Sequence, residues 1–370
     1  MGGDLVKLFL SGDVMLGRGV DQILPHPGDP ALAEAYLKDA RSYVRLAEEA
    51  SGPVPRGAAW TWPWGDALRI LDAAAPDVRI VNLETSVTEQ GESVPGKAVH
   101  YRMHPQNLPC LAVARPDVCS LANNHVMDYG RRGLTDTLDS LADAGFTAAG
   151  AGRDLDAARR PAAVPLPGGG RVLVFCLGTE SSGIPPGWAA TPDRSGVHLV
   201  PETPEGAAEV TSRIREAKRP GDLAVVSVHF GSNWGYGVPA DRVRFAHALV
   251  DGGADLVHGH SSHHPRPLEV YRGRLVTYGC GDLIDDYEGI GGYEGYRDDL
   301  RPLYFPVLDR RTGALREARV VVLRAHRMRL RPAGADDCAW LGEVLERVSS
   351  PYGAHVGLLT DGALSVTAAA

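Results

Sequence analysis

The sequence predicts an α/β protein in which short apolar strands alternate with amphipathic helices. Apolar runs of strand length recur along the chain, at residues 5–11, 78–81, 117–122, 171–177, 223–228 and 254–257. Segments of helical periodicity lie between them, at residues 67–75, 135–144, 204–218 and 240–250. Several of the apolar runs end abruptly in polar or titratable residues. In open α/β sheets ligands bind beyond the carboxyl ends of the strands, so we expect a functional site at this edge.

The composition is that of a soluble globular protein, and it restricts the classes of partner. Of 370 residues, 44% are apolar, which is ample material for a large core. The formal net charge of -8 comes without a basic stripe, so we expect no nucleic-acid partner. The five cysteines are widely spaced and contain no C-x-x-C pair, which predicts reduced thiols rather than a disulfide framework or a zinc knuckle.

The amino-terminal segment shows no targeting signal. Its apolar run within residues 5–10 is far shorter than the apolar region of a secretory signal, and no small-residue cleavage site follows it. No later stretch approaches the roughly 20 apolar residues that cross a bilayer. We therefore expect a cytoplasmic protein without a membrane anchor.

We expect one continuous domain over residues 1–330. Residues 25–60 form a proline-bounded insertion near the site, with an amphipathic helix over residues 31–50. Three tryptophans lie close together at the end of this insertion and just after it, Trp60, Trp62 and Trp64. We expect them to pack in the core rather than to line a substrate-binding surface. Residues 331–370 are predicted to add a peripheral helix at 336–349 and a frayed, alanine-rich tail.

The apolar run at 117–122 ends in Asn123-Asn124-His125, with Asp128 three residues later. Amide and imidazole groups that are buried without partners cost roughly 1–3 kcal/mol each, so a buried strand would not end in this way for packing alone. The stretch therefore indicates a site. A polar turn in which the asparagine side chains bond their own backbone is the alternative.

Two other strand ends carry carboxylates. Asp13 follows the first apolar run and precedes glycines that let the backbone approach a ligand closely, although a helix N-cap is an alternative role for it. Asn82 and Glu84 follow the run at 78–81, and their side chains project from the same face of an extended strand end. Both side chains can therefore point into one pocket.

The later strand ends are rich in histidine. His258, His260, His263 and His264 lie within seven residues, and His229 ends the run at 223–228. Histidine is the commonest metal ligand and the usual acid or base near neutral pH, so this pattern favours a metal or acid–base site over a purely structural role. Asp282 closes a further strand, and the acidic segment at 285–299 after it is expected to be a solvated loop, with a divalent-cation site as the alternative.

In chain order the strand ends carry Asp13, Glu84, Asn124-His125, His229, His260 with His263, and Asp282. This order resembles the CapA family of poly-γ-glutamate synthesis proteins, which belongs to the calcineurin-like metallophosphatase superfamily. The resemblance covers nearly the whole chain, and it is carried by Gly12-Asp13-Val14-Met15-Leu16-Gly17-Arg18, Asn82-Leu83-Glu84, Ala122-Asn123-Asn124-His125, Val228-His229 and Gly259-His260. It implies a four-layer sandwich of two central mixed sheets flanked by helices, with the site at the carboxyl ends of the strands.

The resemblance also implies roles for individual residues. The expected ligands of one or two divalent metals (Mn, Fe or Zn) are Asp13, Asn124, His229, His260 and His263. The expected catalytic residues are His125, as the general acid near the leaving group, with Glu84, Arg18 and Asp282. We further expect substrate-binding roles for Asn82, Asn123, Asp128, Trp234 and His258. Two metals about 3.5–4 Å apart would stabilise both the attacking and the leaving oxygen of a phosphoryl transfer.

The chain departs from the superfamily pattern at three points. Met15 stands where the Asp-x-His motif places a histidine ligand, and Asn82-Leu83-Glu84 offers one carboxylate where Gly-Asp and a further acid are usual. The Gly-His-x-His turn is one residue longer here, between His260 and His263. At least one metal position is therefore expected to be weakened, and the reaction need not be phosphoester hydrolysis.

Three functional hypotheses follow. The first is a metal-dependent hydrolase or ligase-like enzyme that acts on a phospho or γ-glutamyl amide substrate. The second is metal-independent acid–base chemistry, such as dehydration or cyclisation of a small molecule in a bacterial biosynthetic pathway, with Glu84 or Asp282 accepting a proton and His125 or His229 donating one. The third is a non-catalytic assembly or polymer-binding protein. The expected partner is accordingly a small molecule or a glutamyl polymer.

Overall fold

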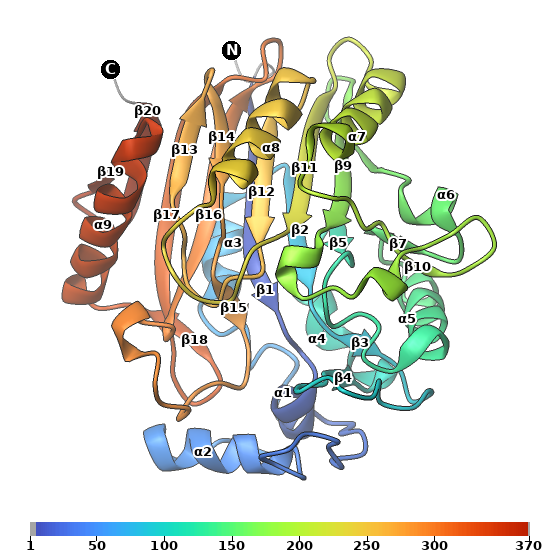
Figure 1. Ribbon diagram of the computed structural model, residues 1–370. Helices are drawn as coiled ribbons and strands as arrows, with labels where there is room; N and C mark the ends of the chain where they lie inside the picture. Colours follow the sequence, from blue (N-terminus) through green and yellow to red (C-terminus); the bar gives the residue numbers. More distant parts are fainter. Residues whose placement is uncertain (1–4, 369–370) are drawn as a thin grey trace.

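The computed structural model describes residues 5–368 and contains two large β-sheets packed face to face (Figure 1). The ten-stranded sheet has the order β19 (Ala354–Leu358), β20 (Leu364–Ala368), β17 (Leu315–Ala325), β16 (Leu300–Asp309), β1 (Leu5–Val14), β2 (Val78–Leu83), β5 (Val118–Ser120), β6 (Ala148–Ala149), with β15 (Asp282–Ile284) beside β1 and β18 (Leu330–Pro332) beside β17. The six-stranded sheet has the order β13 (Leu268–Tyr271), β14 (Arg274–Thr277), β12 (Leu256–His260), β11 (Leu223–His229), β9 (Arg171–Gly178), β8 (Ala162–Pro165). Two short pairs complete the strands, β3 (Ser86–Val87) with β4 (Arg102–Met103) and β7 (Ala151–Gly152) with β10 (Gly196–Val197).

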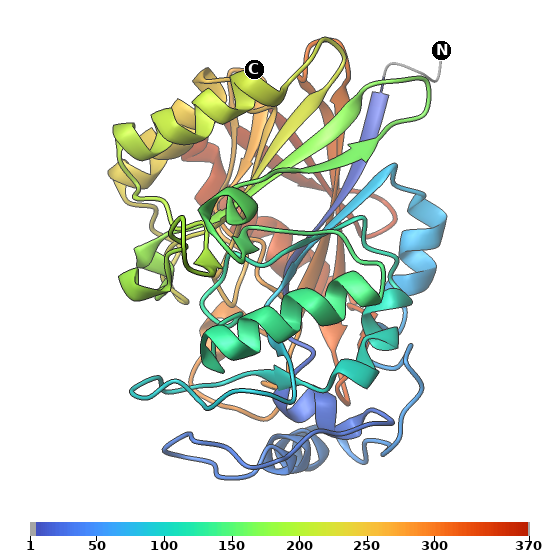
Figure 2. The same ribbon diagram turned by 90° about the vertical axis from the view of Figure 1, so that its right-hand side faces the viewer.

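Helices cover the outer faces of both sheets, and Figure 2 shows these layers from the side. The helices are α1 (Arg18–Ile23), α2 (Arg41–Ser51), α3 (Ala67–Ala74), α4 (Pro109–Ala112), α5 (Gly130–Asp143), α6 (Leu155–Ala158), α7 (Pro204–Ala217), α8 (Ala240–Asp251) and α9 (Ala335–Ser349). Short 3-10 turns lie at Pro105–Asn107, Glu180–Ser182, Pro186–Trp188, Glu294–Tyr296 and Ser350–Tyr352. Apolar residues of α3, α4 and α5 pack on the ten-stranded sheet, whereas those of α7 and α8 pack on the six-stranded sheet.

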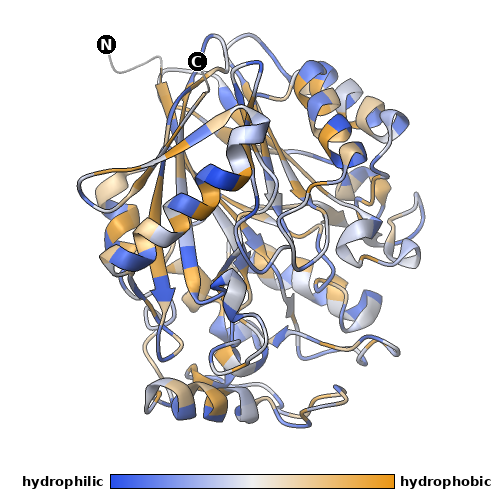
Figure 3. Ribbon diagram, turned by 60° about the vertical axis from the view of Figure 1, so that its left-hand side comes forward, coloured by the Kyte–Doolittle hydropathy of each residue, from blue (hydrophilic) through white to orange (hydrophobic). Residues whose placement is uncertain are grey.

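The alternation of side chains along the strands builds three apolar layers. In β1, Leu8 and Leu10 point into the core between the sheets, and Phe9 points to the helices on the outer face. In β11, Val225 faces the same inner core, and Val226 faces α7 and α8. In Figure 3 the strands are largely hydrophobic and the surface helices are hydrophobic on one side. This arrangement confirms the predicted α/β sandwich of two mixed sheets flanked by helices.

The insertion at residues 25–60 contains less helix than the sequence predicted. Residues 31–40 are irregular, and α2 begins at Arg41. The Asp39 carboxylate accepts a hydrogen bond from the backbone N–H of Arg41 at 2.9 Å, which forms a turn directly before the helix. The helix expected to span residues 31–50 is therefore shorter by about its first half.

The carboxyl-terminal segment joins the ten-stranded sheet. After α9, which matches the predicted helix, β19 and β20 pair in antiparallel fashion and β20 continues the sheet from β17. Val356, Leu364 and Val366 are buried in the core between the sheets, which explains why this hairpin docks. These two strands were not predicted, and the alanine-rich end beyond Ala368 lies outside the described residues.

Two further expectations concern thiols and membrane spans. All five cysteines are buried free thiols, as their spacing predicted. Among residues 5–368, no helix combines the length and the apolar character needed to cross a bilayer.

Strand register places the predicted site residues at one edge of the sandwich. β1 is parallel to both β2 and β15, so Asp13 lies opposite Asn82 on one side and Asp282 on the other. β11 is parallel to β12, which sets His229 opposite His260. The carboxyl ends of β1, β2, β11 and β12 meet where the two sheets converge. Asp282 was expected to close a strand, but it is the first residue of β15, and it reaches this edge because β15 pairs with β1 at Asp13.

The contact between β1 and β15 leaves no room for a side chain at Gly12. A Cβ atom there would lie 1.7 Å from the Gly281 carbonyl oxygen. We expect Gly12→Ala to lower the free energy of unfolding by at least about 3 kcal/mol, because a backbone atom cannot move aside as a flexible side chain can. The measurement is urea unfolding followed by circular dichroism. Gly187→Ala is the matched control, since a Cβ there meets nothing within 4 Å, and its effect should stay within about 0.5 kcal/mol. Equal stability of the two variants would contradict the close approach.

Candidate active site

The polar side chains at the strand ends form one buried cluster. Each of the following is at most 7% exposed: Asp13, Glu84, His125, His229, His260, His263 and Asp282. Asp13, Glu84 and Asp282 come from the ten-stranded sheet, and His229 and His260 come from the six-stranded sheet. Charged and polar groups buried to this degree need hydrogen-bonding partners or an ion.

Two sets of donor atoms in this cluster have the geometry of metal sites. In each set, the ligand atoms of three residues lie within 4.8 Å of one another. The first set is Asp13, His229 and His260, and the second is Asp13, His263 and Asp282. Asp13 belongs to both. Imidazole and carboxylate donors suit zinc, iron and manganese, so the residues present fit a divalent metal of the kind predicted.

The imidazole rings of His229 and His260 in the first set lie close together. Nδ1 of His229 lies 2.8 Å from Nδ1 of His260, and Nε2 of His260 lies 2.9 Å from the Ser227 hydroxyl. Burial, followed by the charge of neighbouring rings, lowers the pKa of both histidines well below its usual value. Both rings are therefore neutral near pH 7, which is the form that binds metals.

Met15, where the resemblance leads us to expect a histidine ligand, lies in the same part of the chain as the Asp13 that the second set contains. Met15 is buried, and its sulfur lies 4.0 Å from the Tyr287 hydroxyl. Asp282 reaches the cluster from β15, whose pairing with β1 puts it next to Asp13. His263 Nδ1 lies 3.0 Å from an oxygen of Asp282, and its Nε2 lies 2.9 Å from the Asn233 amide. Asp282 therefore brings a second carboxylate next to Asp13 at the edge of the sheet where Met15 lies.

Negative charge is concentrated in this cluster. Burial, then the charges of Glu84 and Asp282, raise the pKa of Asp13 well above its usual value. Burial and the charge of Asp282 raise the pKa of Glu84 to about 8. A divalent cation would be the largest positive charge in the cluster and would reverse these shifts.

Asp282 is also part of a buried network that extends away from the cluster. The Arg301 guanidinium lies 3.6 Å from Asp282 and 2.6 Å from Asp285. Burial would raise the pKa of Asp282, but His263 and Arg301 hold it below the usual value.

Asp285 and Asp286 are themselves buried, so the expectation of a solvated loop is wrong for this part of the acidic segment. The cations Arg301 and Arg18 draw these two carboxylates inward.

His125 lies beside the donor sets, and its ring contacts a carboxylate and an ammonium group. Its Nδ1 lies 2.7 Å from Asp128 and 2.9 Å from the Lys97 ammonium, and its Nε2 lies 3.8 Å from Glu84. Tyr101 packs edge-on against the ring at 4.6 Å between centroids. Burial, opposed by Asp128 and assisted by Lys97, lowers the pKa of His125 to about 4. Asp128 therefore accepts a hydrogen bond from Nδ1 of a neutral ring and leaves Nε2 directed toward Glu84, and Lys97 pairs with Asp128.

The three predicted asparagines connect the two sheets at the cluster. The Asn82 amide donates to Asp13 at 2.7 Å and to Glu84 at 2.9 Å. Asn123 donates to the Asn82 side chain at 3.1 Å and accepts from the backbone N–H of His125. Nε2 of His229 lies 3.1 Å from the amide oxygen of Asn124. Asn124 thus lies next to the first donor set. Asn82 holds the carboxyl groups of Asp13 and Glu84, and Asn123 holds the backbone of His125.

Ser261 holds Asp13 from the turn after β12. Its backbone N–H donates to the Asp13 carboxylate at 3.2 Å, and its φ of 104° lies in the left-handed region that favours glycine. Its hydroxyl donates to the Gly231 carbonyl at 3.0 Å. A non-glycine residue held in this conformation is a form of strain that clusters at functional sites.

Three other predicted site residues lie outside the two donor sets. Arg18 is buried beneath them, where it binds Asp286, Glu34 and the Tyr101 hydroxyl. His258 lies between Ser227 and the Ser11 carbonyl. Trp234 lies at the rim, stacked on Tyr293 at 3.8 Å between centroids. Of the clustered tryptophans, Trp64 is buried and donates to the Cys110 carbonyl, which is a packing role.

Sequence reasoning missed Lys97. It lies between β3 and β4, outside any strand end, and its ammonium contacts the Asn124 carbonyl and the Asp128 carboxylate. Burial lowers the pKa of this lysine, although Asp128 opposes the shift. The local sequence carries no signal for this role, because the contact depends on how the segment folds over α5.

Comparison with known proteins places these residues in a family. The family of bacterial capsule synthesis proteins PGA_cap matches residues 7–287. A probable polyglutamine synthesis accessory protein of Mycobacterium tuberculosis H37Rv is 52% identical over 369 residues, covering 99% of this chain and 97% of the relative. The PGA biosynthesis protein CapA of Bacillus subtilis 168 is 29% identical over 286 residues, covering 76% of this chain and 64% of the relative.

A solved structure shows a more distant similarity. A phosphatase from Mycoplasma pneumoniae, described as novel, aligns with a TM-score of 0.47 and 11% identity, over 87% of this chain and 94% of the other. The family match includes the strand ends from Asp13 to Asp282, and the mycobacterial relative extends the similarity over nearly the full length. The chain therefore belongs to the PGA_cap family of bacterial capsule synthesis proteins, as its resemblance to CapA predicted.

Proposed function

We propose that this protein is a metal-dependent hydrolase that cleaves amide bonds of a glutamyl polymer. The observation that supports this most strongly is the pair of buried donor sets that share Asp13. Relatives whose names refer to polyglutamine synthesis and to PGA biosynthesis support a glutamyl polymer as substrate. Hydrolysis is a reaction by which an accessory protein can trim or release such a polymer.

The protein residues divide into two groups. The first group would hold one or two divalent ions, and it consists of the two donor sets, Asp13, His229 and His260, and Asp13, His263 and Asp282. When bound, such an ion polarises a carbonyl oxygen and lowers the pKa of a water molecule. His125 would move a proton between the attacking water and the leaving nitrogen through Nε2, because Asp128 accepts from its other nitrogen.

A second candidate is metal-independent acid–base chemistry. Met15 in place of a histidine ligand favours it, and so does the 3.8 Å separation between Glu84 and His125, two groups that can exchange protons. In this case Glu84 and His125 would act directly on a small substrate. Activity that survives complete removal of metal would favour this candidate over hydrolysis by a metalloenzyme.

We expect the protein purified without chelator or added metal to contain at least about one equivalent of manganese, iron or zinc. Mass spectrometry on the desalted protein measures this content. Asp13→Asn should lose nearly all of the metal, because Asp13 belongs to both donor sets. His247→Gln is the matched control, since His247 lies on α8 beside Glu269, away from the cluster. A folded, metal-free wild-type protein would refute the metalloenzyme proposal.

His125→Ala separates proton transfer from metal binding. We expect this variant to retain its metal and to cleave poly-γ-glutamate about 10²–10⁴-fold more slowly, the usual contribution of a general acid or base. Polymer length by gel filtration, together with the release of free amino groups, measures cleavage. Loss of metal in this variant would show that His125 is a ligand. Unchanged cleavage would exclude it as the proton-transfer group.

Lys97→Met tests the residue that sequence reasoning missed. Asp128 is fully buried, and the loss of a cationic partner should lower the free energy of unfolding by about 3 kcal/mol. Urea unfolding of the metal-free protein measures this effect without a contribution from metal binding. Lys38→Met is the control, because the Lys38 ammonium bonds the Glu34 carbonyl rather than a buried carboxylate, and its effect should be within about 1 kcal/mol. Equal effects would show that the Lys97–Asp128 pair adds no stability.

A further inference from the structure

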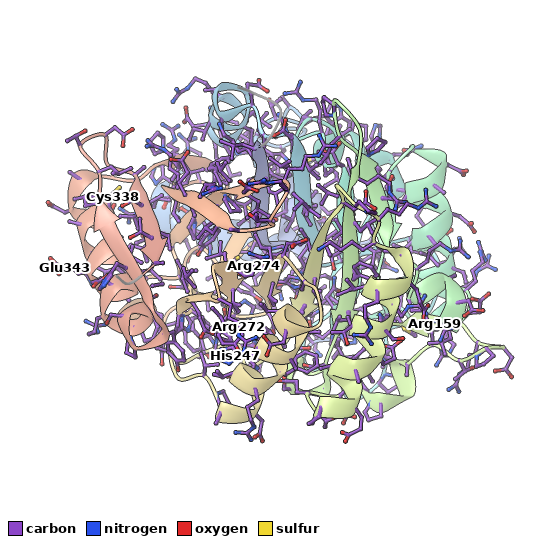
Figure 4. All side chains as sticks on the ribbon, turned by 90° about the horizontal axis from the view of Figure 1, so that it is seen from above. Arg159, His247, Arg272, Arg274, Cys338 and Glu343 are labelled. Carbon is purple, nitrogen blue, oxygen red and sulfur yellow. The ribbon has the colours of Figure 1, made fainter. Side chains whose placement is uncertain are left out.

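A second polar cavity lies at the opposite end of the six-stranded sheet. It has a volume of about 480 Å³ and is lined by the segment after α7, the start of β11 and β12, and the turn between β16 and β17. The candidate active site is at the other end of the same strands. Because β11 has seven residues, the two sites are separated by about 20 Å. Figure 4 views this end of the molecule, with Arg274 labelled near its centre.

Positive charge predominates in the cavity wall. Six cationic residues line it, and they are Arg215, Lys218, Arg219, Arg274, Arg310 and Arg311. Asp222 and Asp255 are the two carboxylates of the lining. The whole chain has a formal net charge of -8, so this excess is a local feature. Local charge of this kind attracts anions even when the protein as a whole repels them.

The two carboxylates of the wall are already neutralised. Lys218 lies 2.6 Å from Asp255, and Arg171, just outside the cavity, lies 2.6 Å from Asp222. Burial would raise the pKa of Asp222, but the hydrogen bond and charge of Arg171 hold it below the usual value. Each of the two carboxylates therefore has a cationic partner of its own.

The remaining arginines keep their charge available. Within residues 5–368, Arg215, Arg219, Arg310 and Arg311 form no ion pair with a carboxylate. Arg310 is held by the carbonyls of Gly221 and Pro167, which orient its guanidinium without cancelling its charge. The guanidinium group binds carboxylates through two parallel hydrogen bonds, so several arginines around one cavity suit a ligand with several carboxylates.

We propose that this cavity binds a segment of a carboxylate-rich polymer such as a poly-glutamate chain, separately from the candidate active site. Three of the arginines, Arg215, Arg219 and Arg311, are exposed at the rim, so a chain can pass across the opening without being enclosed. A nucleic acid is a poorer fit, because the positive surface is confined to one cavity and does not form a stripe. The choice of polymer rests on the proposed function, whereas the anion site itself rests on the charges of the wall.

The experiment measures binding of a fluorescently labelled, short poly-γ-glutamate by anisotropy, with the full-length protein as purified. Arg219→Glu combined with Arg311→Glu should weaken binding about tenfold or more, because two attractive charges become repulsive. Metal content should stay unchanged. The matched control is Arg45→Glu combined with Arg331→Glu, which makes the same change of charge at exposed positions on α2 and β18. This control should bind within about twofold of the wild type, since distant surface charges are screened.

Three outcomes would overturn the proposal. If the cavity variant binds the polymer as tightly as the wild type, the cavity is not the binding site. If the control variant is weakened equally, the change in affinity reflects only the net charge of the protein. Competition by tripolyphosphate or duplex DNA that is as strong as competition by unlabelled poly-γ-glutamate would indicate a general phosphate site. Replacement of Arg215, Arg219 and Arg311 by Gln keeps the test valid if charge reversal disturbs folding. The two proposals can fail separately. If the wild-type protein contains no metal but the cavity variant still binds the polymer more weakly, the proposed metal-dependent hydrolysis is refuted and the anion site is retained.

Discussion

The buried carboxylate of Asp13 is the constraint on which the rest of this structure depends. It lies at the junction of the two sheets, bonded by the Asn82 amide and the Ser261 backbone N–H, with the carboxyl groups of Glu84 and Asp282 as neighbours. An ionised carboxylate in such a place is costly unless positive charge compensates it. His263 and Arg301 supply part of that compensation from the side of Asp282. The two sets of donor atoms around Asp13 could hold a cation that supplies the rest of this compensation.

Backbone packing brings this carboxylate into place. Gly12 and Gly281 lie in contact, which lets β15 pair with β1 and sets Asp13 beside Asp282. The six-stranded sheet then contributes His229 and His260 from two parallel strands in register. Ser261 takes a left-handed conformation directly after His260, and this turns its N–H toward Asp13. A side chain at Gly12, or a shift in either register, would separate the donor atoms.

The sequence predicted the parts of the site that depend on local pattern. Asp13, His229 and His260 follow apolar strands, and the parallel arrangement of α/β sheets implies that such strand ends meet. Lys97 was missed because it lies on an irregular segment, and its contact with Asp128 arises from tertiary folding. The burial of Asp285 was missed for a related reason. Its cationic partner Arg301 lies on another strand, 16 residues later, so the local sequence looks like a solvated acidic loop.

The insertion at residues 25–60 is linked to the site through charge. Arg18 binds Glu34 of the insertion and also Asp286, which lies four residues after Asp282. The hydroxyl of Tyr43, on α2, donates to Glu34 at 2.5 Å, and the Tyr43 ring packs against the Arg18 guanidinium at 3.6 Å. Breaking a buried ion pair of this kind leaves a charge uncompensated, so the segments that it joins are expected to move together. The insertion is therefore joined through Arg18 to the loop that follows Asp282, although it supplies no residue to either donor set.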